Sequence, residues 1–115
     1  MNNGIKHVDE QLLSELKDVM EDDFSMLVDT YITDSRQRIE VIRQLQVADD
    51  ALEFSRACHS LKGSSTNLAL LHMAELCKQG EEMGREGKMA ESEALVAAIE
   101  AEFAFVQGIL HSYCN

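Results

Sequence analysis

The feature that most limits the fold of this chain is an apolar pattern of helical period that runs through 115 residues without a single proline. Proline ends or kinks a helix, so its absence leaves long helices uninterrupted. Apolar residues recur at intervals of three and four along most of the sequence, and β-branched residues never gather into the alternating run of a strand. The sequence therefore predicts an all-α fold.

Five helical segments are expected from this pattern. A short one runs from Val8 or Asp9 to about Met20, and longer ones cover residues 23–46, 50–70, 71–85 and 90–113. Four long amphipathic helices with short connections can bury their apolar stripes only against one another. We expect an antiparallel four-helix bundle with a short additional N-terminal helix. Since no repeat or linker interrupts it, residues 1–115 are expected to form a single domain.

Several residues are expected to mark the helix ends. Asp49 and Asp50 precede the 50–70 helix and are typical N-caps. Gly84 and Gly87 lie at and just beyond the end of the 71–85 pattern and are typical of helix C-termini, and Gly84 also falls on the inner side of that helix.

The charge balance excludes several classes of partner. The formal charge is −11, from 21 acidic and 10 basic residues. Nucleic acids and anionic membranes both need a basic surface, so neither is expected as a partner. No apolar run reaches the roughly 20 residues of a membrane span. Three cysteines without a CxxC pair, in a chain without an export signal, indicate reduced thiols and a cytoplasmic protein. We also expect a monomer.

One histidine is placed on the outward face of the 50–70 helix. The apolar side of that helix includes Phe54 and Leu61. Helical spacing puts a separate, mainly polar set on the opposite side: Ser55, His59, Lys62, Gly63 and Thr66. His59 is therefore expected to be exposed to solvent.

The residues around His59 suit phosphoryl chemistry. A neutral imidazole nitrogen can attack a phosphoryl group and hold it covalently. Lys62 lies on the same face, where its ammonium could neutralise phosphoryl oxygens. Gly63 costs the helix about 0.5–1 kcal/mol relative to alanine, which indicates that bare backbone is needed there, as an approaching partner would require. On its own, an exposed histidine is more often just a solvated side chain.

The chain resembles the HPt family, the histidine-containing phosphotransfer domains of phosphorelays. Residues 58–68 read Cys-His-Ser-Leu-Lys-Gly-Ser-Ser-Thr-Asn-Leu, similar to the family signature His-x-Leu-Lys-Gly-small-small followed by an aliphatic residue. The resemblance continues in the next helix through Leu76, Glu81 and Gly84-Arg85. Together with the bundle pattern it covers nearly the whole chain, and its overall form is most similar to a stand-alone bacterial type.

The resemblance implies roles for individual residues. His59 would be the phosphorylated residue. Glu81, which lies 22 residues later, would accept a hydrogen bond from Nδ1 of His59 and leave Nε2 to attack. Arg85 would screen the phosphoryl group or meet the partner. The docking surface is expected around His59, with contributions from the first two helices: Leu12, Leu16, Phe24, Ser55, Gly63, Thr66 and Met83.

The resemblance also implies how such a protein works. It would accept a phosphoryl group from the aspartate of a receiver domain, commonly on a hybrid sensor kinase, and pass it to the receiver of a response regulator. It would be a covalent carrier rather than an enzyme with turnover. It would need no cofactor of its own, because the Mg²⁺ belongs to the receiver domain.

Three positions depart from the family pattern. Cys58 and Ala69 stand where the family often has alanine and glycine. Gly80 stands where a larger apolar residue is common, and a looser core near His59 is expected from it.

The distribution of charge agrees with this interpretation. Residues 55–88 carry five basic and four acidic side chains, whereas the rest of the chain carries five basic and 17 acidic ones. The surface near His59 is therefore close to neutral and would not repel the acidic pocket of a receiver domain.

Two other functions stay open. A helical adaptor could bind a partner through the same face without covalent chemistry. A metal-binding bundle is less well supported, because His111 and Cys114 are too few ligands for a closed zinc site. No histidine is preceded at three residues by the glutamate that carboxylate-bridged di-iron bundles use.

Overall fold

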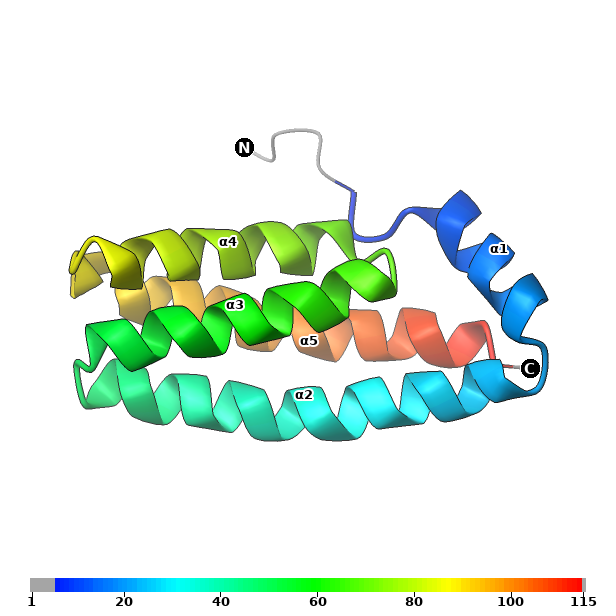
Figure 1. The fold of residues 1–115 in the computed structure, drawn as a ribbon, viewed down its shortest axis with the longest axis horizontal. Coiled ribbons are helices and arrows are strands. Elements are labelled where there is room, and N and C mark those ends of the chain that lie inside the picture. Colours follow the sequence, from blue (N-terminus) through cyan, green and yellow to red (C-terminus); the bar gives the residue numbers. More distant parts are fainter. Residues whose placement is uncertain (1–5, 115) are drawn as a thin grey trace.

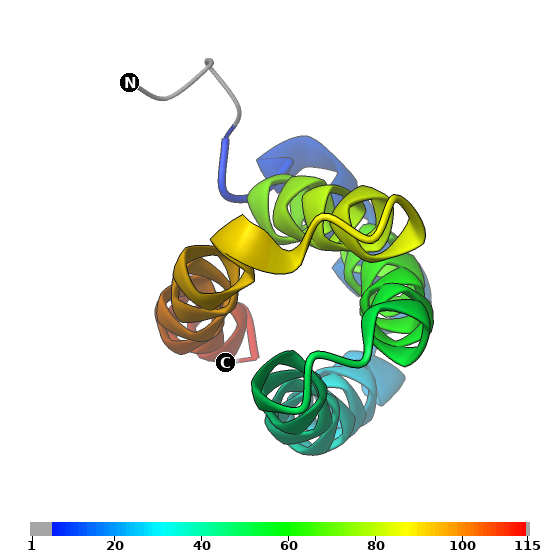
Figure 2. The ribbon, with the colours of Figure 1, turned by 90° about the vertical axis from the view of Figure 1, so that its left-hand side faces the viewer.

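The computed structural model describes residues 6–114, and within that range the regular elements are all helices. They are α1 (Glu10–Met20), α2 (Asp23–Val47), α3 (Ala51–Asn67), α4 (Leu71–Arg85), the short 3₁₀ helix η1 (Met89–Glu91) and α5 (Ser92–Ser112). Helices α2 to α5 run side by side along the long axis, and α1 lies tilted across one end (Figure 1). Seen end-on, the four long helices surround a common centre (Figure 2). The expected all-α bundle with an additional N-terminal helix is confirmed. The start of the chain, on which the lack of an export signal was judged, lies outside the described residues.

The core is built from the apolar stripes of all five α-helices and from two leucines of the turn between α3 and α4. Each large side chain that it buries completely stabilises the fold by about 1.5–3 kcal/mol. Those side chains are Leu13, Phe24, Val28, Ile42, Phe54, Leu61, Leu68, Leu70, Met73, Val96, Ile99 and Leu110.

Helix α5 carries the most apolar stretch of the chain. Together with η1, Met89–Ser112 is long and apolar enough to cross a membrane by length and composition. The segment is not an unbroken apolar run, because Glu91, Glu93, Glu100 and Glu102 interrupt it. The inner face of the helix, which includes Leu95, Ile99 and Val106, is buried in the bundle. A central helix of a packed core meets the same criterion.

The N-terminal ends of α1 and α3 are capped by aspartates. The side chain of Asp9 accepts a hydrogen bond from the backbone N–H of Leu12 at 3.1 Å. That of Asp50 accepts one from Glu53 at 3.3 Å. Asp50 is thus the expected N-cap of α3, whereas Asp49 has a positive φ of 58° and shapes the turn before it.

Helix α3 ends at Asn67, three residues earlier than the apolar pattern suggests. The reason lies at Ala69, whose φ of 58° reverses the chain into α4. A left-handed conformation costs a residue with a Cβ about 1–2 kcal/mol. Glycine suits this position better, which accounts for its frequency there in the family pattern.

The two glycines expected to end α4 have different roles. Gly87, with a φ of 70°, lies just beyond the helix and turns the chain. Gly84 lies inside the helix and faces α3, so its expected place on the inner side is confirmed and its interpretation as a stop signal is wrong. The following segment, expected as one helix from residue 90, is divided into η1 and α5.

Candidate functional site

His59 meets Glu81 and Lys62 across the contact between α3 and α4. The side chain of His59 is 66% exposed, and its Nδ1 lies 2.9 Å from Oε2 of Glu81. The other carboxylate oxygen, Oε1, accepts a hydrogen bond from Nζ of Lys62 at 2.6 Å. A ring nitrogen that faces a carboxylate carries the proton, so Nε2 of the neutral ring keeps its lone pair. The sequence thus identified three residues that the fold brings together.

Glu81 is held in its charged form. The Lys62 ammonium donates to its carboxylate and lowers its pKa below the ordinary value, and the hydrogen bond from His59 acts in the same direction. Partial burial opposes both effects, since the side chain is only 17% exposed. An ionised carboxylate is a permanent acceptor for Nδ1–H and can balance positive charge on the imidazole.

Arg85 lies at the edge of this group. Its Nη1 is 3.9 Å from Oε2 of Glu81, and its side chain is exposed. At that distance the guanidinium contributes charge without a hydrogen bond. It remains free to turn toward solvent or a partner.

Gly63 and Thr66 continue the outward face of α3 beyond His59. A Cβ built on Gly63 would meet nothing within 4 Å, so packing between helices does not explain this glycine. Thr66 is exposed, and its hydroxyl donates to the backbone oxygen of Lys62 at 2.9 Å. Both residues lie on the same side of α3 as His59, one and two helical turns beyond it.

Two of the expected docking residues are buried. Ser55 lies between α3 and α4, where its hydroxyl donates to the backbone oxygen of Glu81 at 2.8 Å. Four residues of helix turn the chain by about 400°, so Ser55 is rotated about 40° from His59, toward α4. Phe24 is 1% exposed and belongs to the core. Met83 is half-buried against the core.

An apolar groove lies between α1 and the end of α3. Leu12 and Leu16 were expected there, and Leu12 is 53% exposed. Val19, which is 81% exposed, was not anticipated, although it follows Leu12 by seven residues and so shares its face. The groove has a volume of about 330 Å³ and is lined by Leu12, Glu15, Leu16, Val19, Thr66, Asn67 and Ala69. Thr66 places it two helical turns from His59 on the same side of α3.

The core beside the site is filled rather than loose. A Cβ on Gly80 would lie 2.6 Å from Sγ of Cys58. The expectation that Gly80 loosens the core is therefore wrong, because the larger residue at position 58 occupies that space. Burial, and the nearby Glu81 carboxylate, raise the pKa of the Cys58 thiol to about 12, which keeps it protonated and unreactive.

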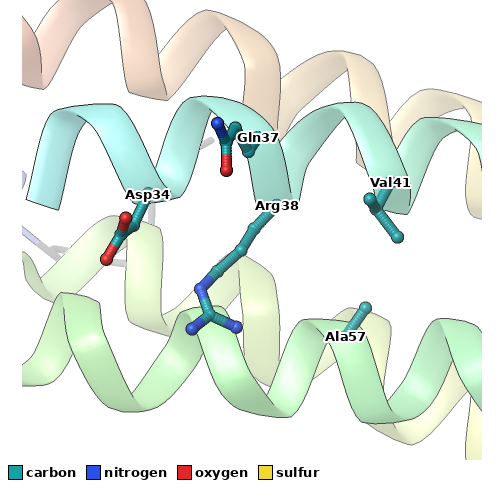
Figure 3. Close-up of a pocket in the computed structure, with 5 residues that line it drawn as sticks. All are labelled: Asp34, Gln37, Arg38, Val41 and Ala57. Carbon is teal, nitrogen blue, oxygen red and sulfur yellow. The ribbon is translucent and has the colours of Figure 1, made fainter.

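A second depression lies between α2 and α3 (Figure 3). Its volume is about 390 Å³, and it is lined by Asp34, Gln37, Arg38, Val41 and Ala57. Arg38 reaches across it and donates to the hydroxyl of Ser60. His59 does not line this depression, which offers no nucleophile beside a base.

A second histidine–glutamate pair has a different setting. Nδ1 of His7 lies 2.7 Å from Oε2 of the buried Glu102 and fastens the segment before α1 to α5. The residues three and four positions after His7 are Glu10 and Gln11, not a lysine and a glycine. Within residues 6–114, no three metal-ligating side chains are placed to hold a metal ion, so the metal-binding alternative gains no support there.

Known proteins share this arrangement of helices. Residues 26–108 match the family model of the Hpt domain. The fold is similar to the crystal structure of histidine-containing phosphotransfer protein B (HptB) from Pseudomonas aeruginosa PAO1, with a TM-score of 0.88, 35% sequence identity and coverage of 92% of each chain. No curated protein sequence matches the chain. The family resemblance drawn from the sequence is confirmed.

Proposed function

Because this chain belongs to the Hpt domain family, whose members act in histidine phosphotransfer, we propose that it carries a phosphoryl group on Nε2 of His59 between receiver domains. One observation supports this most directly. Nδ1 of the exposed His59 is bonded to Glu81, so the other ring nitrogen keeps its lone pair. The chain is then a covalent carrier, without turnover of its own.

The proposed transfer needs no proton to leave the ring. Nε2 attacks the phosphorus of an aspartyl phosphate on the donor receiver. The N–P bond forms as the P–O bond breaks, and the aspartate departs as a carboxylate with the electron pair. The phosphorylated ring, still protonated on Nδ1, gains positive charge that the Glu81 carboxylate offsets. Attack by the aspartate of the acceptor receiver reverses these steps.

Lys62 is proposed to follow the phosphoryl group. In the unphosphorylated protein it is bound to Glu81. An ammonium has three donors on a flexible stem, so it can turn to the phosphoryl oxygens while it stays near the carboxylate. The Mg²⁺ of the reaction is assigned to the acidic pocket of the receiver, where it orients the transferring group.

The docking surface is proposed to extend from His59 over Gly63 to the apolar groove. Leu12 and Val19 expose apolar surface there that suits a complementary apolar face. The nearly neutral charge of residues 55–88 avoids repulsion of an acidic receiver pocket. A receiver of a hybrid sensor kinase is the proposed donor, and that of a response regulator the proposed acceptor. The free cysteines fit a reducing cytoplasm.

Labelling from a phosphorylated receiver domain tests the proposal. Wild-type protein should gain an acid-labile, base-stable label, and His59→Gln should gain none. His111→Gln is the matched control, because His111 is exposed in the last turn of α5. If His59→Gln takes up as much label as wild type, the carrier function is wrong. If wild type binds the receiver but takes no label, the adaptor alternative holds instead.

A further inference from the structure

The face of α4 that packs on α3 carries two glycines four residues apart, and Glu81 lies between them in sequence. A Cβ on Gly84 would lie 2.5 Å from the backbone oxygen of Ala51 and 2.8 Å from the backbone nitrogen of Ser55. Real Cβ atoms essentially never approach so closely. Since both obstacles are backbone atoms, they cannot rotate away, and any larger residue at Gly84 must push α4 from α3.

Glu81 is attached to α3 at both its ends. Its backbone oxygen accepts the Ser55 hydroxyl at 2.8 Å, one turn from the contact at Gly84. Its carboxylate binds His59 and Lys62. A glutamate has a short side chain, so its reach to two partners on the neighbouring helix depends on how closely the two backbones approach.

We infer that Gly84 and Ser55 are positioning residues for phosphotransfer: they hold α4 close enough to α3 for one glutamate to bond both His59 and Lys62. This inference rests on the proposed function of His59. On this inference, the contact between α3 and α4 helps to determine which ring nitrogen of His59 attacks.

The distances show that the contact leaves little margin. An ordinary carbon–oxygen contact is about 3.3 Å, so a Cβ on Gly84 requires a displacement of about 0.8 Å. A shift of that size along the His59–Glu81 direction would lengthen their hydrogen bond from 2.9 Å to about 3.7 Å, beyond hydrogen-bonding range. The proton of the neutral His59 ring would then no longer be confined to Nδ1.

The test compares Gly84→Ala with Gly108→Ala. Gly108 also lies within a helix, but a Cβ there would meet nothing within 4 Å. Two quantities are measured: the tautomer of neutral His59, by ¹⁵N NMR, and the rate constant of phosphotransfer from a receiver. Gly84→Ala should show mixed tautomers and transfer at least about tenfold more slowly, because small misplacements of reacting groups have large effects on rate. Gly108→Ala should match wild type in both.

A double-mutant cycle separates positioning from general damage to the fold. If Gly84 acts through Glu81, then Gly84→Ala should slow transfer little further in a Glu81→Gln background. A slower rate with an unchanged tautomer, or effects that simply add, would overturn the inference. If Gly84→Ala does not fold, Ser55→Ala decides, since it removes the hydrogen bond to Glu81 without adding bulk. A wild-type tautomer and rate in Ser55→Ala then refutes the inference. Failure of the proposed function is distinct, because wild type itself would take no label on His59.

Discussion

Substitution of Gly63 should make the protein more stable and less active at once. The residue lies inside α3, and no atom is within 4 Å of a Cβ built on it. Alanine is favoured over glycine in a helix interior by about 0.5–1 kcal/mol. For a domain of this size, 1 kcal/mol corresponds to roughly 4 °C in Tm. Gly63→Ala should therefore raise Tm by about 2–4 °C, and Gly63→Leu by a similar amount.

Transfer should respond in the opposite direction. Gly63 is one turn from His59 on the face that we propose a receiver covers, and the proposed transfer requires the phosphorus to come within about 3–3.5 Å of Nε2. A misplacement of 1 Å can cost about 10²-fold in rate. We expect Gly63→Leu to slow transfer at least about tenfold, and Gly63→Ala to slow it less.

The assay follows transfer from a phosphorylated receiver under single-turnover conditions, beside thermal unfolding of each variant. Gly108→Ala and Gly108→Leu are matched controls, since Gly108 is also helical and open to solvent. They should gain stability without loss of rate. A wild-type rate for Gly63→Leu would show that no partner passes over Gly63. A Tm of Gly63→Leu below that of wild type would show that the space around residue 63 is not open.

Three further predictions concern charged and buried groups. Lys62→Ala should slow transfer and shorten the lifetime of the phosphorylated protein, because it removes the cation beside His59. A transfer rate and a lifetime equal to those of wild type would contradict the role proposed for Lys62. The lowered pKa of Glu81 stabilises the fold above its ordinary value of 4.5, and this contribution is lost as pH falls through the lowered pKa. The stability advantage of wild type over Glu81→Gln in urea unfolding should therefore shrink below pH about 4.5, and a constant difference would contradict it. Burial raises the pKa of Tyr31 to about 12, and its hydroxyl lies 2.8 Å from that of Ser65. Tyr31→Phe should cost about 1 kcal/mol at neutral pH, but the difference should narrow between pH about 10 and 12 as wild type loses stability; a gap that widens there would refute this.

Spacing along one helix was enough to predict most of the site. Lys62 and Gly63 follow His59 by three and four residues, so helical geometry alone puts them on its face. Glu81 came from the family resemblance, because no spacing within α3 identifies a partner on another helix. Ser55 was misplaced for a related reason: its rotation of about 40° from His59 decides between solvent and α4, and only the position of α4 settles which.

Distances between helices were beyond prediction. The apolar pattern placed Gly84 on the inner side of its helix but also suggested a helix stop, and it could not show that a Cβ there would lie only 2.5 Å from the backbone oxygen of Ala51. Cys58 and Gly80 each departed from the family pattern without an evident reason. The thiol of Cys58 occupies the space that a side chain at Gly80 would need across the α3–α4 contact, which neither position reveals by itself.

The hydrogen-bonded side chains of His59, Lys62 and Glu81 all belong to one helical hairpin. It consists of α3 and α4, joined by a turn of three residues. Helices α2 and α5 contribute support but none of the hydrogen bonds made by His59, Lys62 or Glu81. The outer faces of α2 and α5 can therefore diverge while the hydrogen bonds between His59, Glu81 and Lys62 are retained. We expect a hairpin of this kind, moved onto another pair of supporting helices, to keep the hydrogen bonds of Glu81 to His59 and Lys62, because both bonds lie within it.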